Sequence, residues 1–336
     1  MRSRLLAPAQ IEDLLGTPSL GALVQALAAT PYSGDLQEAL VRYEGVRAVD
    51  AALSRNLQRT TQSILGFADG PPLKLITILL LRCDLANLRT IVRGKHANRP
   101  AEEILDAVVP TGTLGEVALK EMAGHPNITV LAGTLEVVNH PFAAPLAEGV
   151  AEYAQTNDPL SIELRLDRAY ADHVLRQTRG RRDALGLREI LLDEIDATNV
   201  KTALRLASAV AASPGALSSR EDRLRFFIPG GRAVDEETFL DLSAAQTLAR
   251  AWMHLRTQGF PVKTLPQDLV AFERELDVRL ANALAGRYLA GDPLGLDIII
   301  GYLAMKSAEV ANLRLIARGK FLGLAREAMR RELVVV

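Results

Sequence analysis

The residues of this chain that could most readily do chemistry are three carboxylates, each followed by an amide and then by bases at fixed spacing. The three copies read Asp84-Leu85-Ala86-Asn87-Leu88-Arg89, Asp196-Ala197-Thr198-Asn199-Val200-Lys201 and Glu309-Val310-Ala311-Asn312-Leu313-Arg314, and further bases follow at Arg93, Arg205 and Arg318. If the three carboxylates converged on one point, they could bind a cation, because carboxylate oxygens are ligands for hard metal ions. The other interpretation is a hydrogen-bond network that holds the fold. We favour it, because a repeated Asp-x-x-Asn on a helix border is more often structural.

The spacing of the three copies indicates an internal repeat. Asp84 and Asp196 are 112 residues apart (196 − 84), and Asp196 and Glu309 are 113 apart (309 − 196), in a chain of 336 residues. A fixed period means that one unit is copied along the chain. This period is the size of a small domain rather than of a thin solenoid repeat. We therefore expect three homologous helical domains, at residues 1–112, 113–231 and 232–336.

Proline and glycine mark corresponding breaks in each third of the chain, and both residues interrupt helices. The breaks before the long helices are Pro31-Tyr32, Pro141-Phe142 and Pro261; the turns before the signature helices are Gly70-Pro71-Pro72, Gly180 to Gly186, and Gly291-Asp292-Pro293; the unit boundaries are Val109-Pro110-Thr111-Gly112 and Ile228-Pro229-Gly230-Gly231. An aliphatic-Asp pair also recurs, at Val49-Asp50, Leu166-Asp167 and Leu276-Asp277.

The elements that must position the carboxylates are amphipathic helices. Counting the acid as zero, positions 1, 4, 7 and 8 are apolar in every copy, and they form one stripe on a helix. The acid and the asparagine border this stripe, whereas the bases lie roughly 140–180° around the helix from the acid. The acid therefore cannot easily reach its own base, since helical side chains pair at three or four positions. Our hypothesis is that the acidic edge of one unit meets the basic edge of a neighbouring unit.

The composition favours a nearly all-α protein. Hydrophobic residues make up 49% and aromatic residues only 4% of the chain, and the abundant alanine and leucine recur at helical spacing. Few segments alternate in the manner of strands. A net charge of −1 argues against a broad nucleic-acid surface.

Motifs for catalysis and for cofactors are missing from the sequence. We find no Gly-x4-Gly-Lys-Ser/Thr phosphate loop, no Gly-x-Ser-x-Gly elbow and no histidine or cysteine pair at metal-ligand spacing. We therefore expect no catalytic residue, no cofactor, no metal and no direct nucleotide binding.

Cys83, the only cysteine, cannot form an internal disulfide. The apolar run Leu75 to Leu81 is too short to span a bilayer, and the N-terminus lacks the apolar core of a signal peptide. The isolated chain is expected to be a soluble monomer.

The repeated signature resembles a known family. Residues 80–95, which end in Arg93-Gly94-Lys95, and residues 308–320, which end in Arg318-Gly319-Lys320, resemble the C subunit of the V/A-type rotary ATPases and are similar to the d subunit of the eukaryotic vacuolar enzyme. Ile228-Pro229-Gly230-Gly231 fits as well, and the resemblance covers the whole chain. The second copy departs from it, because Leu206 stands where the other two copies have glycine.

The resemblance implies a fold and a job. The fold would be a funnel of three helical domains around a pseudo-threefold axis. One face would sit on the membrane proteolipid ring at the cytoplasmic face of the membrane. The mouth would receive the central shaft, which is built from subunits of the D and F type. One copy per complex would transmit torque and catalyse nothing.

Two alternatives stay open beside this interpretation. One is a helical adaptor that binds soluble partners, and the other is an enzyme with its site at the threefold centre. Under the favoured interpretation, the candidate residues for the partner interface or for a network between repeats are Asp84, Asn87, Arg89, Arg93, Asp196, Asn199, Lys201, Arg205, Glu309, Asn312, Arg314 and Arg318.

Overall fold

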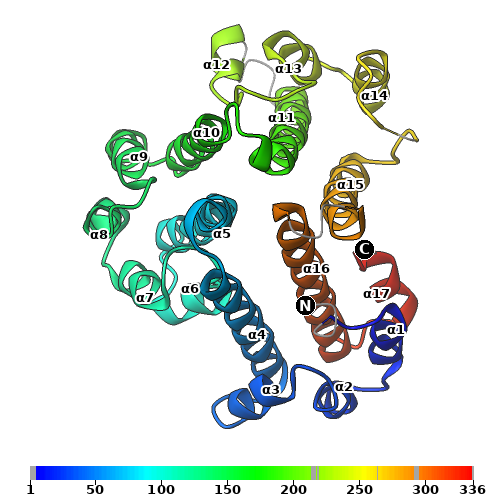
Figure 1. The fold of residues 1–336 in the computed structure, drawn as a ribbon. Coiled ribbons are helices and arrows are strands. Elements are labelled where there is room, and N and C mark those ends of the chain that lie inside the picture. The colour runs from blue at the N-terminus through cyan, green and yellow to red at the C-terminus, as the bar shows by residue number, and fades with distance from the viewer. Residues whose placement is uncertain (1–4, 213–216, 218, 263, 291–294, 335–336) are drawn as a thin grey trace. The chain divides into compact units, whose positions relative to one another are not determined.

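The computed structural model describes residues 5–212, 217, 219–262, 264–290 and 295–334, without the side chains of 212 and 288–290. All regular secondary structure in these residues is helical (Figure 1), which confirms the expected all-α class. The expected turn Gly291-Asp292-Pro293 lies outside the described residues. Within the described part of the chain, no helix is long and apolar enough to cross a membrane.

The helices of the first and last thirds of the chain follow one order: short helices, then two long helices, then one short helix. The second third departs from it, because the 14-residue α9 precedes α10 and a 3-10 helix separates α10 from α11. The first third contains α1 (Pro8–Gly16), α2 (Leu20–Leu27), α3 (Ser33–Leu40), α4 (Gly45–Phe67), α5 (Gly70–His96) and α6 (Ala101–Ala107). The second contains α7 (Glu116–Gly124), η2 (Ile128–Val130), α8 (Leu131–Val137), α9 (Ala143–Thr156), α10 (Leu160–Gln177), η3 (Arg182–Ala184), α11 (Leu185–Ala212) and α12 (Arg220–Leu224). The third contains α13 (Glu236–Ser243), α14 (Leu248–Thr257), α15 (Leu269–Ala290), α16 (Leu296–Phe321) and α17 (Arg326–Glu332). The expected boundaries at 112 and 231 stay predictions.

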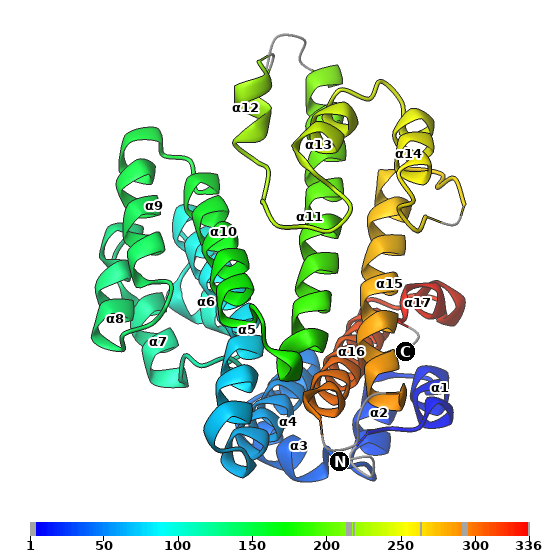
Figure 2. The ribbon, with the colours of Figure 1, turned by 45° about the horizontal axis from the view of Figure 1, so that its top comes forward.

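Two compact units are distinguished by their internal contacts. The first comprises Met1–Pro126 and Ala281–Val336, so it holds both ends of the chain, and the second comprises Asn127–Leu280. In the first unit, α4 packs along α16 although the two come from opposite ends of the chain (Figure 2). In the second unit, α9 packs on α10, and α11 packs on α13.

The signature sequences occupy α5, α11 and α16, the second long helix of each third. Their apolar stripes are buried, as the periodicity predicted. Each stripe residue is at most 7% exposed: Leu85, Leu88, Ile91 and Val92 on α5; Ala197, Val200, Ala203 and Leu204 on α11; Val310, Leu313, Ile316 and Ala317 on α16. In α16 this stripe joins a core with residues of α1 to α4, and in α11 it joins a core with residues of α13 to α15.

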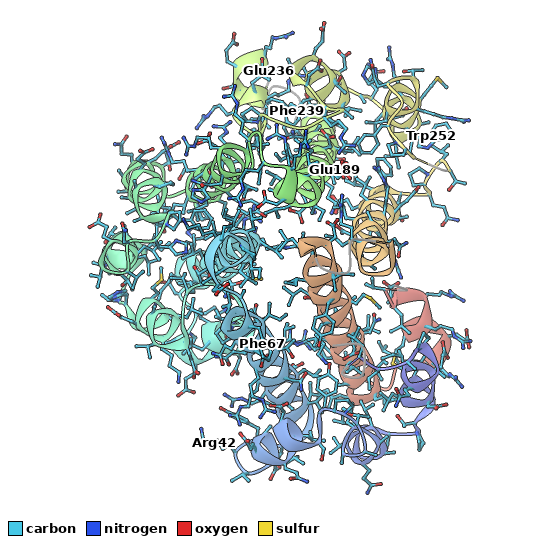
Figure 3. The ribbon with its side chains drawn as sticks, viewed as in Figure 1. Arg42, Phe67, Glu189, Glu236, Phe239 and Trp252 are labelled. Atoms are coloured by element: carbon cyan, nitrogen blue, oxygen red, sulfur yellow. The ribbon has the colours of Figure 1, made fainter. Side chains whose placement is uncertain are left out.

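Aromatic side chains divide between the cores and the surface (Figure 3). Phe239 of α13 is fully buried, whereas Phe67, at the last position of α4, is 90% exposed. Trp252 of α14 packs at the edge of the second unit's core, with the Arg256 guanidinium 5.2 Å from its ring centre.

Candidate functional site: three joints on the signature helices

Each signature acid is buried and binds the chain segment that leads into a short helix. Asp84 on α5 is fully buried, and its Oδ2 accepts the backbone N–H (2.8 Å) and the hydroxyl (2.6 Å) of Thr113. Its Oδ1 accepts the N–H of Leu114 at 2.9 Å. These residues immediately precede α7. We call the acid, its asparagine and the segment that they bind a joint, so that Asp84 and Asn87 form joint 1.

Asp196 makes the same arrangement in joint 2. Its Oδ2 accepts the N–H groups of Arg232 (3.1 Å) and Ala233 (2.9 Å), and its Oδ1 accepts that of Val234 (3.0 Å), just before α13. Burial is the largest influence on this group and raises the pKa of the Asp196 carboxyl above its usual value, and the three backbone donors only partly oppose that shift.

The asparagine of each joint pairs with the backbone of one residue through both its donor and its acceptor. Asn87 donates to the carbonyl of Val109 at 2.8 Å and accepts its N–H at 3.0 Å. Asn199 does the same with Ile228 (2.8 and 2.9 Å), and Asn312 with Val334 (both 2.8 Å). A side-chain amide is suited to this task because it carries a donor and an acceptor side by side, whereas a carboxylate lacks the donor.

The glycines at the predicted unit boundaries allow the chain to approach the carboxylates. A Cβ at Gly112 would lie 1.9 Å from Oδ1 of Asp84, and a Cβ at Gly231 would lie 2.1 Å from Oδ1 of Asp196. Real side chains essentially never come so close, so only glycine fits at either place. The Pro-containing boundary motifs are therefore parts of the joints.

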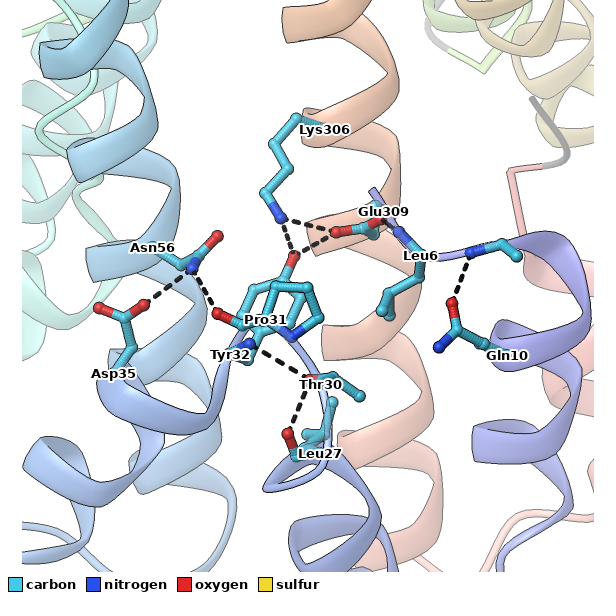
Figure 4. A network of polar contacts seen from close by, with 11 residues as sticks. Leu6, Gln10, Leu27, Thr30, Pro31, Tyr32, Asp35, Asn56, Lys306 and Glu309 are labelled. Carbon is cyan, nitrogen blue, oxygen red and sulfur yellow. Dashed lines mark hydrogen bonds and ion pairs between the residues drawn. The ribbon is translucent and has the colours of Figure 1, made fainter. Parts of the chain in front are cut away.

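Joint 3 is built differently, because its two bound segments come from opposite ends of the chain. Oε2 of Glu309 accepts the N–H of Leu6 at 2.5 Å (Figure 4). Asn312, three residues further along α16, binds Val334. Oε1 accepts the hydroxyl of Tyr32 (2.6 Å) and the ammonium of Lys306 (2.7 Å). The joint-3 helix thus holds the N-terminal and the C-terminal segments together.

Tyr32 and Lys306 are also bonded to one another. The ammonium donates to the Tyr32 oxygen at 2.9 Å and lies 4.2 Å from the centre of its ring. Both side chains are 1% exposed. Burial raises the pKa of the Tyr32 hydroxyl well above its usual value, and the nearby Glu309 carboxylate adds to this. A buried lysine is tolerated here because its charge is paired and hydrogen-bonded.

The signature bases of α11 and α16 pair with acids of another long helix. In the second unit, Lys201 pairs with Asp277, and Arg205 binds Glu273 through two bonds of 2.6 and 2.8 Å. In the first unit, Arg314 (3.6 Å) and Arg318 (3.0 Å) both approach Asp50, and Arg314 also donates to Ser54. On α5, Arg89 is half-buried and Arg93 is exposed.

The partners of Asp196 and Glu309 are not those expected if the acidic edge of one unit met the basic edge of a neighbouring unit. Asp196 is held by backbone donors, and Glu309 by a backbone donor, a tyrosine and a lysine of its own helix. The physical reason is that a buried carboxylate needs several donors at fixed positions, which backbone N–H groups supply at no cost in side-chain entropy. Lys201, Arg314 and Arg318 instead meet two of the recurrent aliphatic-Asp residues, Asp277 and Asp50.

The repeated Gly-Lys pair also has a structural role in α5 and α16. A Cβ at Gly94 would lie 2.5 Å from Ile104 of α6, and one at Gly319 would lie 2.3 Å from Met329 of α17. The neighbouring lysines bind the C-terminal ends of short helices: Lys95 donates to the carbonyl of His125, and Lys320 to those of Leu15 and Thr17. Burial lowers the pKa of both lysines.

Sequence reasoning placed the acids and asparagines on one helix border. It missed residues that complete the joints or bind the ends of the short helices. The missed residues are Leu6, Tyr32, Lys95, Gly112, Gly231, Lys306 and Lys320. Tyr32, the two glycines, Lys95 and Lys320 stood inside motifs that were recognised, whereas Lys306 has no counterpart in the other copies. Within the described residues, no group of three or more histidines, cysteines or carboxylates could hold a metal ion.

The fold and the joints define an all-helical protein in which an acid–asparagine pair on a long helix binds distant chain segments at three places. The family model described as "ATP synthase (C/AC39) subunit" matches residues 1–332. The chain is 32% identical to the C subunit of the V-type ATP synthase of Deinococcus radiodurans, over 99% of this chain and 88% of that protein. It is 30% identical to the corresponding V-type protein of Thermus thermophilus, over 99% and 95%. It is 28% identical to the C subunit of the A-type ATP synthase of Haloferax volcanii, over 91% and 86%.

The chain therefore belongs to the C-subunit family of the V/A-type rotary ATP synthases, as the resemblance of its signatures indicated. Members of this family are structural, non-catalytic subunits of the complex.

Proposed function

We propose that this chain is the socket of the central stalk, which couples the rotor shaft to the membrane proteolipid ring. Its partners would be shaft subunits of the D and F type on one side and the ring on the other, at the cytoplasmic face of the membrane. One copy would serve each complex and would pass torque between ion translocation and ATP synthesis or hydrolysis. The three-domain funnel and the bounds of its repeats are part of this proposal.

The observation that carries the proposal is the construction of the joints. A part that transmits torque must not yield where its segments meet. Each acid–asparagine pair fixes its bound segment through several hydrogen bonds; in joint 2, Asp196 accepts three from the backbone, and Asn199 adds two more. Buried hydrogen bonds of this kind are expensive to break, because each freed group would remain desolvated. The joints therefore favour a stiff coupling part over a flexible adaptor.

The charge of the chain fits reversible assembly with polar partners. The net charge is −1, with 39 basic and 40 acidic residues, so the chain carries many charges of both signs. Interfaces that form and dissociate are more polar than obligate ones. Which of the twelve signature residues touch a partner stays a prediction; the bases on α11 and α16 already pair within their own units.

A pull-down tests the proposal. The tagged full chain is incubated with detergent-solubilised membranes, and the proteins that come with it are identified by mass spectrometry. Shaft and proteolipid subunits are expected together. Recovery of soluble partners alone would instead favour the adaptor, and recovery of neither would remove the assigned partners.

A further inference from the structure

Joint 3 corresponds to joint 1 anchor for anchor, except that no short linker joins its anchors, Leu6 and Val334. In joint 1 the asparagine binds Val109, the acid binds Leu114, and Pro110-Thr111-Gly112-Thr113 connects them. In joint 3 the asparagine binds Val334 and the acid binds Leu6. The anchors are again a valine and a leucine, held by residues three positions apart on the helix. By analogy with joint 1, we expect that a peptide of four residues can connect the two anchors.

The residue before the acid's anchor differs between the two joints: it is Thr113 in joint 1 and Leu5 in joint 3. Asp84 receives two of the three bonds given above from Thr113, which is a linker residue. For Glu309, the backbone of the described residues supplies the N–H of Leu6 alone. Its other donors are the side chains of Tyr32 and Lys306, on the same Oε1. The side chains of Tyr32 and Lys306 thus supply donors to Glu309, as Thr113 does to Asp84.

A cavity lies beside joint 3. Its volume is about 180 Å³, and its wall includes Leu5, Leu6, Met305, Leu333 and Val334 beside Glu309 and Asn312. Leu6 and Leu333 are nevertheless buried in the core of the first unit, so apolar packing and polar contacts both hold these segments.

We propose that Tyr32 and Lys306 are positioning residues that take the place of the donors of Thr113: they hold Glu309 in place for the N–H of Leu6 and so keep the N-terminal segment docked on α16. Among the joints in the described part of the chain, joint 3 alone binds two segments that no linker connects. This inference rests on the joints themselves and does not depend on the proposed function.

The first test is hydrogen exchange in the full-length chain. The double variant Tyr32→Phe, Lys306→Met keeps the approximate size of both side chains and removes their polar contacts with Glu309. Exchange of the amides of residues 6–11 is expected to become at least ten-fold faster, while that of residues 113–119, at joint 1, stays unchanged. Equal protection of residues 6–11 in the variant and the parent would overturn the proposal. Lys201→Met, which breaks an ion pair on the helix of joint 2, is the matched control and is expected to leave residues 6–11 unchanged.

A second test separates positioning from simple loss of packing. A circular permutant joins Val334 to Leu6 through Pro-Thr-Gly-Thr, the joint-1 linker, and opens the chain in the exposed turn between Asn157 and Asp158. The permutant then receives Glu309→Asp together with Tyr32→Phe and Lys306→Met, so that its acid and its linker match those of joint 1. We expect the hydrogen-exchange rates of the amides of residues 6–11 to lie within three-fold of those in the unsubstituted permutant. If the substitutions increase exchange as much as in the linear chain, Tyr32 and Lys306 serve only as core residues and the proposal fails.

Discussion

Carboxylates that are buried in a protein need compensation, and this chain provides it in two ways. Asp84 and Asp196 accept bonds from backbone N–H groups, which carry no net charge. Glu309 is instead paired with a buried lysine and a buried tyrosine. Removal of one partner from a buried ion pair is far more damaging than loss of a surface pair, because the remaining charge stays desolvated. Joint 3 is therefore the joint most sensitive to single substitutions.

The paired hydrogen bonds of the asparagines give the first prediction. Asn199 is fully buried, and Asn199→Ala would leave both the N–H and the carbonyl of Ile228 without their partner. We expect a loss of about 2–6 kcal/mol in the free energy of unfolding, at roughly 1–3 kcal/mol for each of the two buried groups left unsatisfied. Urea unfolding of the isolated chain measures it. Asn282→Ala on the exposed surface of α15 is the control and should change stability by less than about 0.5 kcal/mol. Equal effects of the two substitutions would refute the structural role.

The raised pKa of Asp196 gives a prediction with a definite sign. The folded carboxyl binds a proton more readily than the unfolded one, whose pKa is about 3.9. The stability that this residue contributes must then fall as the pH rises from about 3.9 through the folded pKa. Asp196→Asn removes the titration. We expect the difference in unfolding free energy, wild type minus variant, to increase when the pH is lowered from about 7 towards about 4. A difference that shrinks on acidification would contradict the assignment.

The spacing of acid and asparagine could be found from the sequence, but their partners could not. Backbone donors such as those of Thr113 and Leu114 leave no residue signature, because any amino acid except proline supplies an N–H. Gly112 and Gly231 were visible as boundary glycines, yet their closeness to a carboxylate depends on tertiary structure. Lys306 breaks the internal repeat, so comparing the copies gave no reason to select it.

At the scale of the element, the long helices were predictable because their apolar residues follow the helical period over many turns. The turns between the helices were less predictable. Gly70, with Pro71 and Pro72, begins α5 rather than forming a separate turn, since proline suits the first turn of a helix. Gly186 already lies inside α11, which begins at Leu185. The conformations of glycine and proline at a helix start depend on the neighbouring elements.

The crossing of α9 on α10 depends on one glycine. A Cβ at Gly149 would lie 2.8 Å from the backbone Cα of Ile162, which cannot rotate away. We expect Gly149→Ala to destabilise the chain by about 1–3 kcal/mol, the usual cost of overpacking. Gly133, on α8, has open space around it, so Gly133→Ala should instead stabilise by about 0.5–1 kcal/mol. Thermal unfolding of both variants compares them, and a stabilising Gly149→Ala would show that the helices are not in contact there.

At the scale of the whole molecule, the internal period predicted three homologous helical domains, which stays a prediction; a long helix that carries the signature does occur in each third of the chain. The period could not predict that the first compact unit contains both ends of the chain. Leu6 and Glu309 are 303 positions apart in the sequence, and no local pattern connects them.

The isolated chain is expected to behave as a helical monomer. Light scattering should give the mass of one chain, 36.4 kDa, circular dichroism should be strongly helical, and purified protein should not hydrolyse ATP. A stable dimer would contradict the single-copy role. ATP turnover that persists after removal of contaminating complex would contradict the non-catalytic one.

Coupling in the reconstituted complex tests the socket most directly. The rotary complex is assembled in vesicles with and without this chain, and ATP hydrolysis and ion uptake are measured in the same preparation. Without the chain, we expect the catalytic head to hydrolyse ATP while ion uptake falls to background, and adding the chain should restore uptake. Ion uptake that stays coupled to hydrolysis in the complete absence of the chain would contradict its role as the torque-transmitting socket.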